Sequence, residues 1–277
     1  MARPGTVNEH IMVHAAPKLL LSTAPFFRHP LREAFRHARE AGYDAVEIMV
    51  TSDPATQDAR TIRELADDFG LSVGAIHAPF LLLTRRVWGT DPIGKIYRSA
   101  QVAEQAGIPL VVVHPPYKWQ VRYRRWVEHR LAEYSARAGI TIAVENMFPL
   151  KIRGDRGLRF HASQDFEDLD RFTHLVLDTS HLAVAGYDVV ESYRRYRTKV
   201  LHFHLSNNAG KGWDSHLPVD QGALPLGELL DEVAADGFGG TISLELDLRT
   251  YLGDDEAIKE VLVRNREFCE RRLAART

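Results

Sequence analysis

Short runs of apolar and β-branched residues alternate along the chain with longer segments of amphipathic pattern. Runs of this length that are rich in Val, Ile and Leu are typical of buried strands. The runs that we predict to be strands are Lys18–Ser22, Ala45–Met49, Ser72–His77, Leu110–His114, Thr141–Glu145, His174–Asp178, Val200–His204 and Thr241–Glu245.

The longer segments carry apolar residues at the spacing of one helix face. The predicted helices include Leu31–Ala41, Ala59–Phe69, Pro92–Ala106, Tyr123–Ala138, Gly227–Ala235 and Glu256–Leu273. Glycine follows several of them, as a left-handed helix cap requires. These glycines are Gly42, Gly70, Gly107, Gly139 and the pair Gly239-Gly240.

Eight strand–helix units predict an α/β fold, a (β/α)8 TIM barrel that forms a single domain over residues 1–277. Residues 1–16 precede the first strand and are interpreted as an N-terminal extension. The main alternative, a doubly wound open sheet, needs a glycine-rich loop after its first strand. Leu21–Pro25 contains no glycine, so the barrel is favoured.

The composition indicates where the protein works and which metal ligands it can offer. Hydrophobic residues make up 45% of the 277 residues, and charged residues make up 26%, as in ordinary globular domains. We find no apolar run long enough to span a membrane and no signal peptide, so we expect a cytoplasmic protein without a membrane partner. Cys269 is the single cysteine. Any metal site would therefore use nitrogen and oxygen ligands.

Ligand-type residues stand at the ends of six predicted strands: His77, His114, Glu145, Asp178, His204 and Glu245. The carboxyl ends of all barrel strands meet on one face, where TIM-barrel enzymes keep their active sites. Any one of these residues alone could be a loop residue, and Asp178 could simply cap the following helix. Together they predict a site for a divalent metal ion, with Zn²⁺ or Mn²⁺ first and Co²⁺ or Mg²⁺ also considered.

Three further residues extend this set. His181 follows Asp178 by three positions, the spacing of about one helical turn. Asp214 and His216 project to the same side if their segment is extended. We interpret the three as candidates for further metal ions or for contacts with substrate.

The sequence resembles the xylose isomerase-like TIM-barrel superfamily, which includes sugar and sugar-phosphate isomerases and epimerases and endonuclease IV. The resemblance covers Leu19 to Leu246. It is carried by Ile76-His77-Ala78-Pro79-Phe80, Val113-His114-Pro115, Val144-Glu145-Asn146, Asp178-Thr179-Ser180-His181, Ala185-Gly186-Tyr187-Asp188, His204-Leu205-Ser206-Asn207, Asp214-Ser215-His216 and Leu244-Glu245.

The epimerase branch implies one divalent ion held by four residues: Glu145, Asp178, His204 and Glu245. Glu145 and Glu245 would be the catalytic acid and base, exchanging a proton beside a carbonyl group through an enediolate. His181 would hold a substrate hydroxyl. Glu47 matches a polar substrate contact of that branch, and a role in orienting a neighbouring group fits it equally.

The endonuclease IV branch implies a zinc cluster held by all nine residues: His77, His114, Glu145, Asp178, His181, His204, Asp214, His216 and Glu245. Such a cluster would hydrolyse a phosphodiester. Several departures from that branch count against DNA as the substrate, among them Met147-Phe148-Pro149 in place of a glycine-rich continuation and Phe80 in place of a tyrosine. Lys118–Trp126 mixes cations with aromatics, which suits either nucleic acid or a solvated helix whose aromatic rings pack inward.

We therefore expect a metal-dependent isomerase or epimerase of a sugar or sugar phosphate, with a zinc phosphodiesterase as the alternative and a related lyase as a third possibility. The expected partner is a small sugar-like molecule. A net charge of −2 gives no general attraction to nucleic acid. The sequence leaves the oligomeric state, the sugar and the native metal open.

Overall fold

Parallel strands close into a barrel in the computed structural model, which describes residues 17–79, 87–151, 157–158 and 166–274. The barrel strands are β1 (Lys18–Ser22), β2 (Ala45–Met49), β3 (Ser72–His77), β4 (Leu110–Val113), β5 (Thr141–Glu145), β8 (Leu175–Asp178), β9 (Val200–Leu205) and β10 (Thr241–Leu244). Their order is β1-β10-β9-β8-β5-β4-β3-β2, with β2 next to β1. The predicted (β/α)8 barrel is thus confirmed, and each strand lies within one residue of its predicted bounds.

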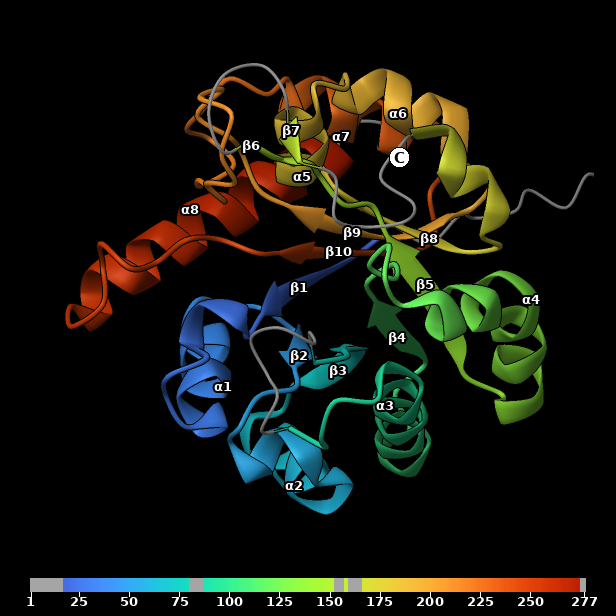
Figure 1. Ribbon diagram of the computed structural model, residues 1–277. Helices are drawn as coiled ribbons and strands as arrows, with labels where there is room; N and C mark the ends of the chain where they lie inside the picture. Colours follow the sequence, from blue (N-terminus) through green and yellow to red (C-terminus); the bar gives the residue numbers. More distant parts are fainter. Residues whose placement is uncertain (1–16, 80–86, 152–156, 159–165, 275–277) are drawn as a thin grey trace, which may run out of the picture.

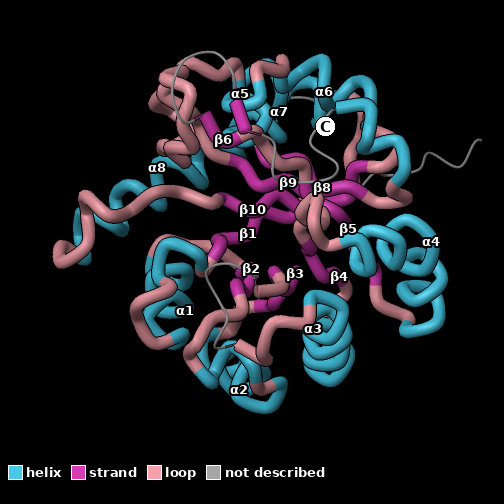
Figure 2. The backbone as a smooth tube through the Cα atoms, in the orientation of Figure 1, coloured by secondary structure: helices cyan, strands magenta, loops and turns pink. Residues whose placement is uncertain are grey.

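Helices surround these strands (Figures 1 and 2). They are α1 (Leu31–Glu40), α2 (Ala59–Phe69), α3 (Pro92–Ala106), α4 (Val121–Ala138), α5 (Thr179–Ala185), α6 (Val189–Tyr196), α7 (Leu226–Ala235) and α8 (Asp255–Ala274). Short 3-10 helices occur at Ala24–Phe26, Pro54–Gln57 and Phe166–Arg171. Between β5 and β8 the chain also forms an antiparallel pair, β6 (Leu150–Lys151) and β7 (Gly157–Leu158). Among the described residues, no helix is long and apolar enough to cross a membrane.

The apolar core has two parts. The larger cluster includes Leu21, Phe35 and Ile62, and it draws on the helices as well as the strands. The smaller one consists of Leu20, Ala45, Ala75, Leu110, Val112, Ala143 and Val176. Alternation along a strand puts Ala143 on the same face as Glu145, and Val176 on the same face as Asp178. We therefore interpret the smaller cluster as the packed interior of the barrel beneath the polar strand ends.

Strands β9 and β10 contribute nothing to that apolar interior. The corresponding positions, two residues before His204 and Glu245, are His202 and Ser243, both fully buried. One side of the barrel interior is therefore polar, and this side lies directly below the candidate site.

Two glycines allow close approaches within the barrel wall. A side chain at Gly74 would place Cβ 2.5 Å from the Leu20 side chain, so glycine leaves room for Leu20 in the interior. At Gly240 a Cβ would lie 2.3 Å from the carbonyl oxygen of Leu201. The Gly239-Gly240 pair was predicted to form a helix cap, but the left-handed residue after α7 is Gly237. Gly240 is instead required by steric contact with the neighbouring strand.

Predictions for some segments fall outside the described residues. These are the N-terminal extension, residues 1–16, and Phe80 of the third-strand motif.

Candidate metal centre

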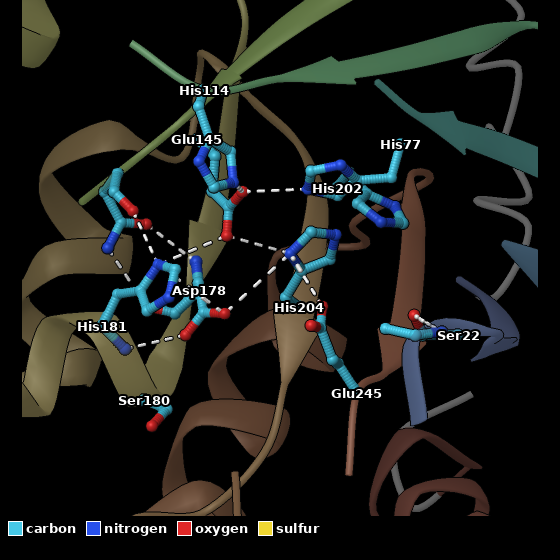
Figure 3. A network of polar contacts seen from close by, with 12 residues as sticks. Ser22, His77, His114, Glu145, Asp178, Ser180, His181, His202, His204 and Glu245 are labelled. Atoms are coloured by element: carbon cyan, nitrogen blue, oxygen red, sulfur yellow. Dashed lines mark hydrogen bonds and ion pairs between the residues drawn. The ribbon is translucent and has the colours of Figure 1, made fainter. Parts of the chain in front are cut away.

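The structure brings all nine predicted ligand residues into one network at the carboxyl ends of the strands, and Figure 3 shows seven of them labelled. His77, Glu145, Asp178 and His204 lie on β3, β5, β8 and β9. His114 and Glu245 directly follow β4 and β10. His181 lies in α5, and Asp214 and His216 lie in the segment between β9 and α7.

Glu145 is the hub of this network. Its Oε2 lies 2.9 Å from His114 Nε2 and 3.3 Å from His77 Nε2. Its Oε1 lies 3.1 Å from His204 Nδ1 and 3.3 Å from His181 Nδ1. The carboxylate is buried, so it is stable there only because imidazoles surround both of its oxygens.

The two oxygens of Asp178 have different surroundings. Oδ1 accepts a hydrogen bond from the backbone N–H of His181 at 2.7 Å, which caps α5. Oδ2 is buried and has no hydrogen-bond partner among the described residues. The side chain of Asn146 fixes the strand end by accepting from the Asp178 N–H and donating to its carbonyl. The capping role and the ligand role predicted for Asp178 are therefore compatible, because each uses a different oxygen.

Backbone carbonyls set the orientation of two histidines. His77 Nδ1–H donates to the carbonyl of Ala78 at 3.0 Å, which leaves Nε2 facing Glu145. His181 Nδ1–H donates to the carbonyl of Asn146 at 2.9 Å, while its Nε2 lies 3.4 Å from Asp214 Oδ2. Holding one ring nitrogen in this way fixes the tautomer and presents the other nitrogen as a ligand, as in many metal sites.

His216 is held in a left-handed backbone conformation, with φ at 41°. Its Nδ1 lies 3.2 Å from the Glu245 carbonyl and 3.1 Å from Ser206 Oγ, and its Nε2 lies 2.8 Å from Asp214 Oδ2. We expected an extended segment to align Asp214 with His216. The turn at His216 aligns them instead, in a conformation that a non-glycine residue adopts only when its surroundings enforce it.

Both ring nitrogens of His204 contact carboxylates, on opposite sides of the ring. Nδ1 lies 3.4 Å from Glu245 Oε2, besides its contact with Glu145, and Figure 3 shows these two carboxylates approaching from different sides. On the other side of the ring, Nε2 lies 3.1 Å from Glu47 Oε1.

The pKa values of the acidic groups reflect this crowding. Burial raises the pKa of Asp178 to about 6, against the opposing influence of the His181 charge. For Glu145, burial also acts to raise the pKa, but the charges of His204 and His114 outweigh it and hold the pKa well below the ordinary value.

The pKa values of His204 and His216 are both raised. Burial acts to lower the pKa of His204, yet the charges of Glu47 and Glu145 raise it well above the ordinary value. For His216 the hydrogen bond with Asp214 also outweighs burial, and its pKa rises to about 9. In the metal-free protein, protons on these imidazoles thus balance the buried carboxylates.

Metal affinity should therefore increase with pH. The pKa of His216 is raised from 6.5 to about 9. In the metal-free protein at pH 7 its positive charge opposes a nearby cation, and it loses its proton only as the pH approaches that value. We expect the apparent affinity for Zn²⁺, measured by chelator competition, to increase through this range and then level off.

The variant His216→Gln should show a weaker pH dependence. His129→Gln, an exposed position on α4, provides the matched control and should retain the full dependence. An unchanged slope in His216→Gln would contradict the assignment.

The donor geometry fits a divalent ion. Ligand atoms of Glu145, Asp178 and His204 lie within 4.8 Å of one another. Asp178 Oδ2 accepts no hydrogen bond and has only longer contacts, at 3.8 Å to His181 Nδ1 and 3.9 Å to His204 Nδ1, so it can still bind a cation. Ligand atoms also lie within 4.8 Å of one another in three overlapping groups: His77–His114–Glu145, Asp178–His181–His216 and, deeper in the barrel, Glu47–His202–His204. The described residues therefore offer places for a central ion and for flanking ones, all with the nitrogen and oxygen donors that such ions accept.

The mouth of the site is less buried than its floor. The side chains of His114, Asp214, His216 and Glu245 are 18%, 22%, 19% and 17% exposed, whereas that of Glu145 is only 2% exposed. A ligand entering from solvent would therefore meet these four residues first.

The basic and aromatic segment Lys118–Trp126 splits into two parts. Trp126 packs against Tyr97 and Tyr134, and Tyr123 is buried with its hydroxyl donating to the carbonyl of His114. Trp119 is 58% exposed and stacks on Tyr117. The inward-packing interpretation therefore holds for the helical residues of the segment.

His202 is a buried residue beside the site to which the sequence analysis gave no role. Its Nε2 lies 3.4 Å from Glu47 Oε2, and its Nδ1 lies 2.6 Å from Thr241 Oγ1. The signal was present in the sequence, because His202 and His204 are two residues apart on a strand and so share a face.

Comparisons with known proteins agree with this architecture. A sequence profile of the xylose isomerase-like TIM barrel matches residues 35–267. An uncharacterized protein of Mycobacterium tuberculosis is 34% identical over 278 residues, covering 93% of this chain and 98% of that protein.

Solved structures show the same fold. A D-tagatose 3-epimerase-like protein matches with a TM-score of 0.69 and 20% identity, covering 93% of this chain and all of the other. The D-allulose 3-epimerase from Methylomonas sp., in complex with D-allulose, matches with a TM-score of 0.68 and 16% identity, covering 93% and 97% of the two chains.

Proposed function

The chain belongs to the xylose isomerase-like TIM barrel family, and from this premise we propose that it is a metal-dependent isomerase or epimerase of a small, polyhydroxylated, sugar-like substrate. The observation that carries the proposal is the approach of Glu145 and Glu245 to the same nitrogen of His204, beside the unsatisfied Asp178 Oδ2. This arrangement combines two potential acid–base groups with the donors for a metal ion.

In this proposal Glu145, Asp178, His204 and Glu245 hold one divalent ion. When bound, the ion polarises the oxygens of the substrate and lowers the free energy of the enediolate. The ion is proposed to be Zn²⁺, Mn²⁺ or a similar metal, because the donors are imidazole and carboxylate groups.

In the proposed reaction, Glu145 and Glu245 transfer the proton. One of Glu145 and Glu245 removes a proton from the carbon beside the carbonyl group, and the other returns a proton to the neighbouring carbon or to the opposite face. Glu245 is the more exposed of the two, so it is the carboxylate that an entering substrate reaches first. In this proposal His181, whose Nδ1 is held by the carbonyl of Asn146, hydrogen-bonds a substrate hydroxyl.

Exchange of carbon-bound hydrogen tests this function directly. The protein, loaded with Mn²⁺, Co²⁺ or Zn²⁺, is incubated in D2O with a panel of ketoses, keto-polyols and phosphosugars, and deuterium incorporation is followed by NMR. We expect incorporation at the carbon beside the carbonyl of at least one substrate, and none after chelation. A complete lack of exchange across the panel would contradict the proposal.

A second function is favoured by one specific observation. The groups His77–His114–Glu145 and Asp178–His181–His216 could hold ions beside the central one, and a multinuclear centre suits phosphodiester hydrolysis. Elemental analysis distinguishes the two, because one ion per chain supports the isomerase and two or three zinc ions support the hydrolase. Cleavage of abasic-site DNA by the zinc-loaded protein would support the hydrolase, and its absence would exclude that substrate.

A further inference from the structure

His204 is held differently from three other histidines of the candidate metal centre. His77, His181 and His216 each direct Nδ1 to a backbone carbonyl. His204 instead directs Nε2 to the carboxylate of Glu47, at 3.1 Å, and presents Nδ1 to the candidate metal centre. The ring of His204 is therefore oriented by a charged carboxylate, whereas the rings of His77, His181 and His216 are oriented by neutral carbonyls.

Glu47 is also held by a second histidine, His202. Its second oxygen lies 3.4 Å from His202 Nε2, and His202 Nδ1 lies 2.6 Å from Thr241 Oγ1. The chain of contacts Thr241–His202–Glu47–His204 connects β10, β9 and β2 across the barrel interior. Glu47, His202 and His204 are fully buried.

A carboxylate in this position is costly unless it has a strong partner. Most strands fill the barrel interior with Ala, Val or Leu. Glu47 does not face the mouth of the site, because the ring of His204 lies between it and the cluster of Glu145 and Glu245. Direct contact with substrate therefore does not explain Glu47, whereas its contact with His204 does.

We propose that Glu47 is a positioning residue for the metal centre, acting through His204. Nε2–H of His204 donates to Glu47, so the lone pair of Nδ1 is directed toward Glu145, Asp178 and Glu245. A carboxylate partner also increases the basicity of the imidazole, which strengthens it as a ligand. This inference rests on the metal centre of the proposed function.

Metal affinity and the spectrum of bound Co²⁺ provide the test, because neither depends on knowing the substrate. Glu47→Gln removes the charge and keeps the size, and Glu47→Leu removes the hydrogen bond as well. We expect both variants to bind Co²⁺ about 10- to 100-fold more weakly than the parent, with an altered visible absorption spectrum. We expect the larger loss in Glu47→Leu.

Ser243→Ala is the matched control. Ser243 is equally buried, stands beside His204 in the register of β10 and β9, and its hydroxyl has no hydrogen-bond partner among the described residues. The control should retain the affinity and spectrum of the parent. A folded Glu47→Gln, verified by circular dichroism, decides the question if Glu47→Leu does not fold.

The outcomes separate this inference from the proposed function. Parent-like affinity and spectrum in Glu47→Gln would overturn the role of Glu47 and leave the metal centre intact. Failure of the parent to bind Co²⁺, Mn²⁺ or Zn²⁺ would overturn both. Weakened binding and a changed spectrum in the Glu47 variants, with an unchanged Ser243→Ala, would support the proposal even if no sugar is turned over.

Discussion

Replacing Glu145 with glutamine is expected to lower turnover by about 10²- to 10⁴-fold, the usual contribution of a positioned acid or base. Glutamine preserves the shape of the side chain but cannot accept the substrate proton. It also removes the buried charge to which His77, His114 and His204 are turned. The measurement is kcat for the substrate identified by deuterium exchange, with saturating metal. Glu245→Gln should have a similar effect.

Exposed glutamates provide the control for these variants. Glu64→Gln, on the outer surface of α2, removes the same charge far from the strand ends and should leave kcat unchanged. Exchange from only one epimer in Glu245→Gln, with no conversion between epimers, would identify Glu145 as the base for that epimer. Parent-like kcat in Glu145→Gln would rule out its acid–base role.

Removing the metal should cause the largest change in stability. An ion that binds only the folded protein stabilises it by about 4 kcal/mol when its free concentration is 1,000 times Kd. For a domain of this size we expect chelation to lower Tm by roughly 10 °C. The measurement is a thermal unfolding scan with saturating Zn²⁺ and with a chelator, at the same pH.

Asp178→Asn separates metal binding from helix capping. Asparagine can still accept from the His181 N–H, so α5 keeps its cap. The pKa of Asp178 is raised from 3.8 to about 6. As the pH rises through that range, the stability of the metal-free protein therefore falls, because the buried carboxyl group must ionise. At neutral pH the metal-free variant should therefore be at least as stable as the metal-free parent.

With metal bound, the parent should be more stable than the Asp178→Asn variant. Asp178→Asn should lose most of the metal-dependent increase in Tm, because it lacks the negative oxygen that faces the cluster. If the variant retains the full increase, Asp178 is not a ligand.

The barrel could be predicted because its signal is local and repeated. Strands such as Ala45–Met49 and helices such as Ala59–Phe69 have clear apolar patterns, and the structure has them with the same bounds. Helix α5 escaped prediction because it has only seven residues and three of its five buried residues, Thr179, Ser180 and His181, are polar, so polar and apolar residues do not separate into an exposed and a buried face. The pair β6–β7 has only two residues per strand, too few to show alternation.

The candidate site was predictable where the topology alone brings residues together. Parallel strands of a barrel end on one face, so the convergence of Glu145 and His204 follows from their positions at strand ends. The approach of Asp214 to His216 depends on a left-handed turn that no periodicity encodes. The link from Glu47 to His202 and His204 depends on which strands face each other across the barrel, which becomes known only when the barrel has closed.

The junction between β8 and α5 has no loop at all. Asp178 is the last residue of the strand, and its side chain caps the helix that starts at the next residue. An insertion here would separate the carboxylate from the helix and turn its free oxygen away from the other ligands. We therefore expect this junction to keep a constant length among related chains. Lineages that acquire new substrates should vary in length elsewhere, as in the segment of residues 50–58 between β2 and α2, which contains none of the nine ligand residues.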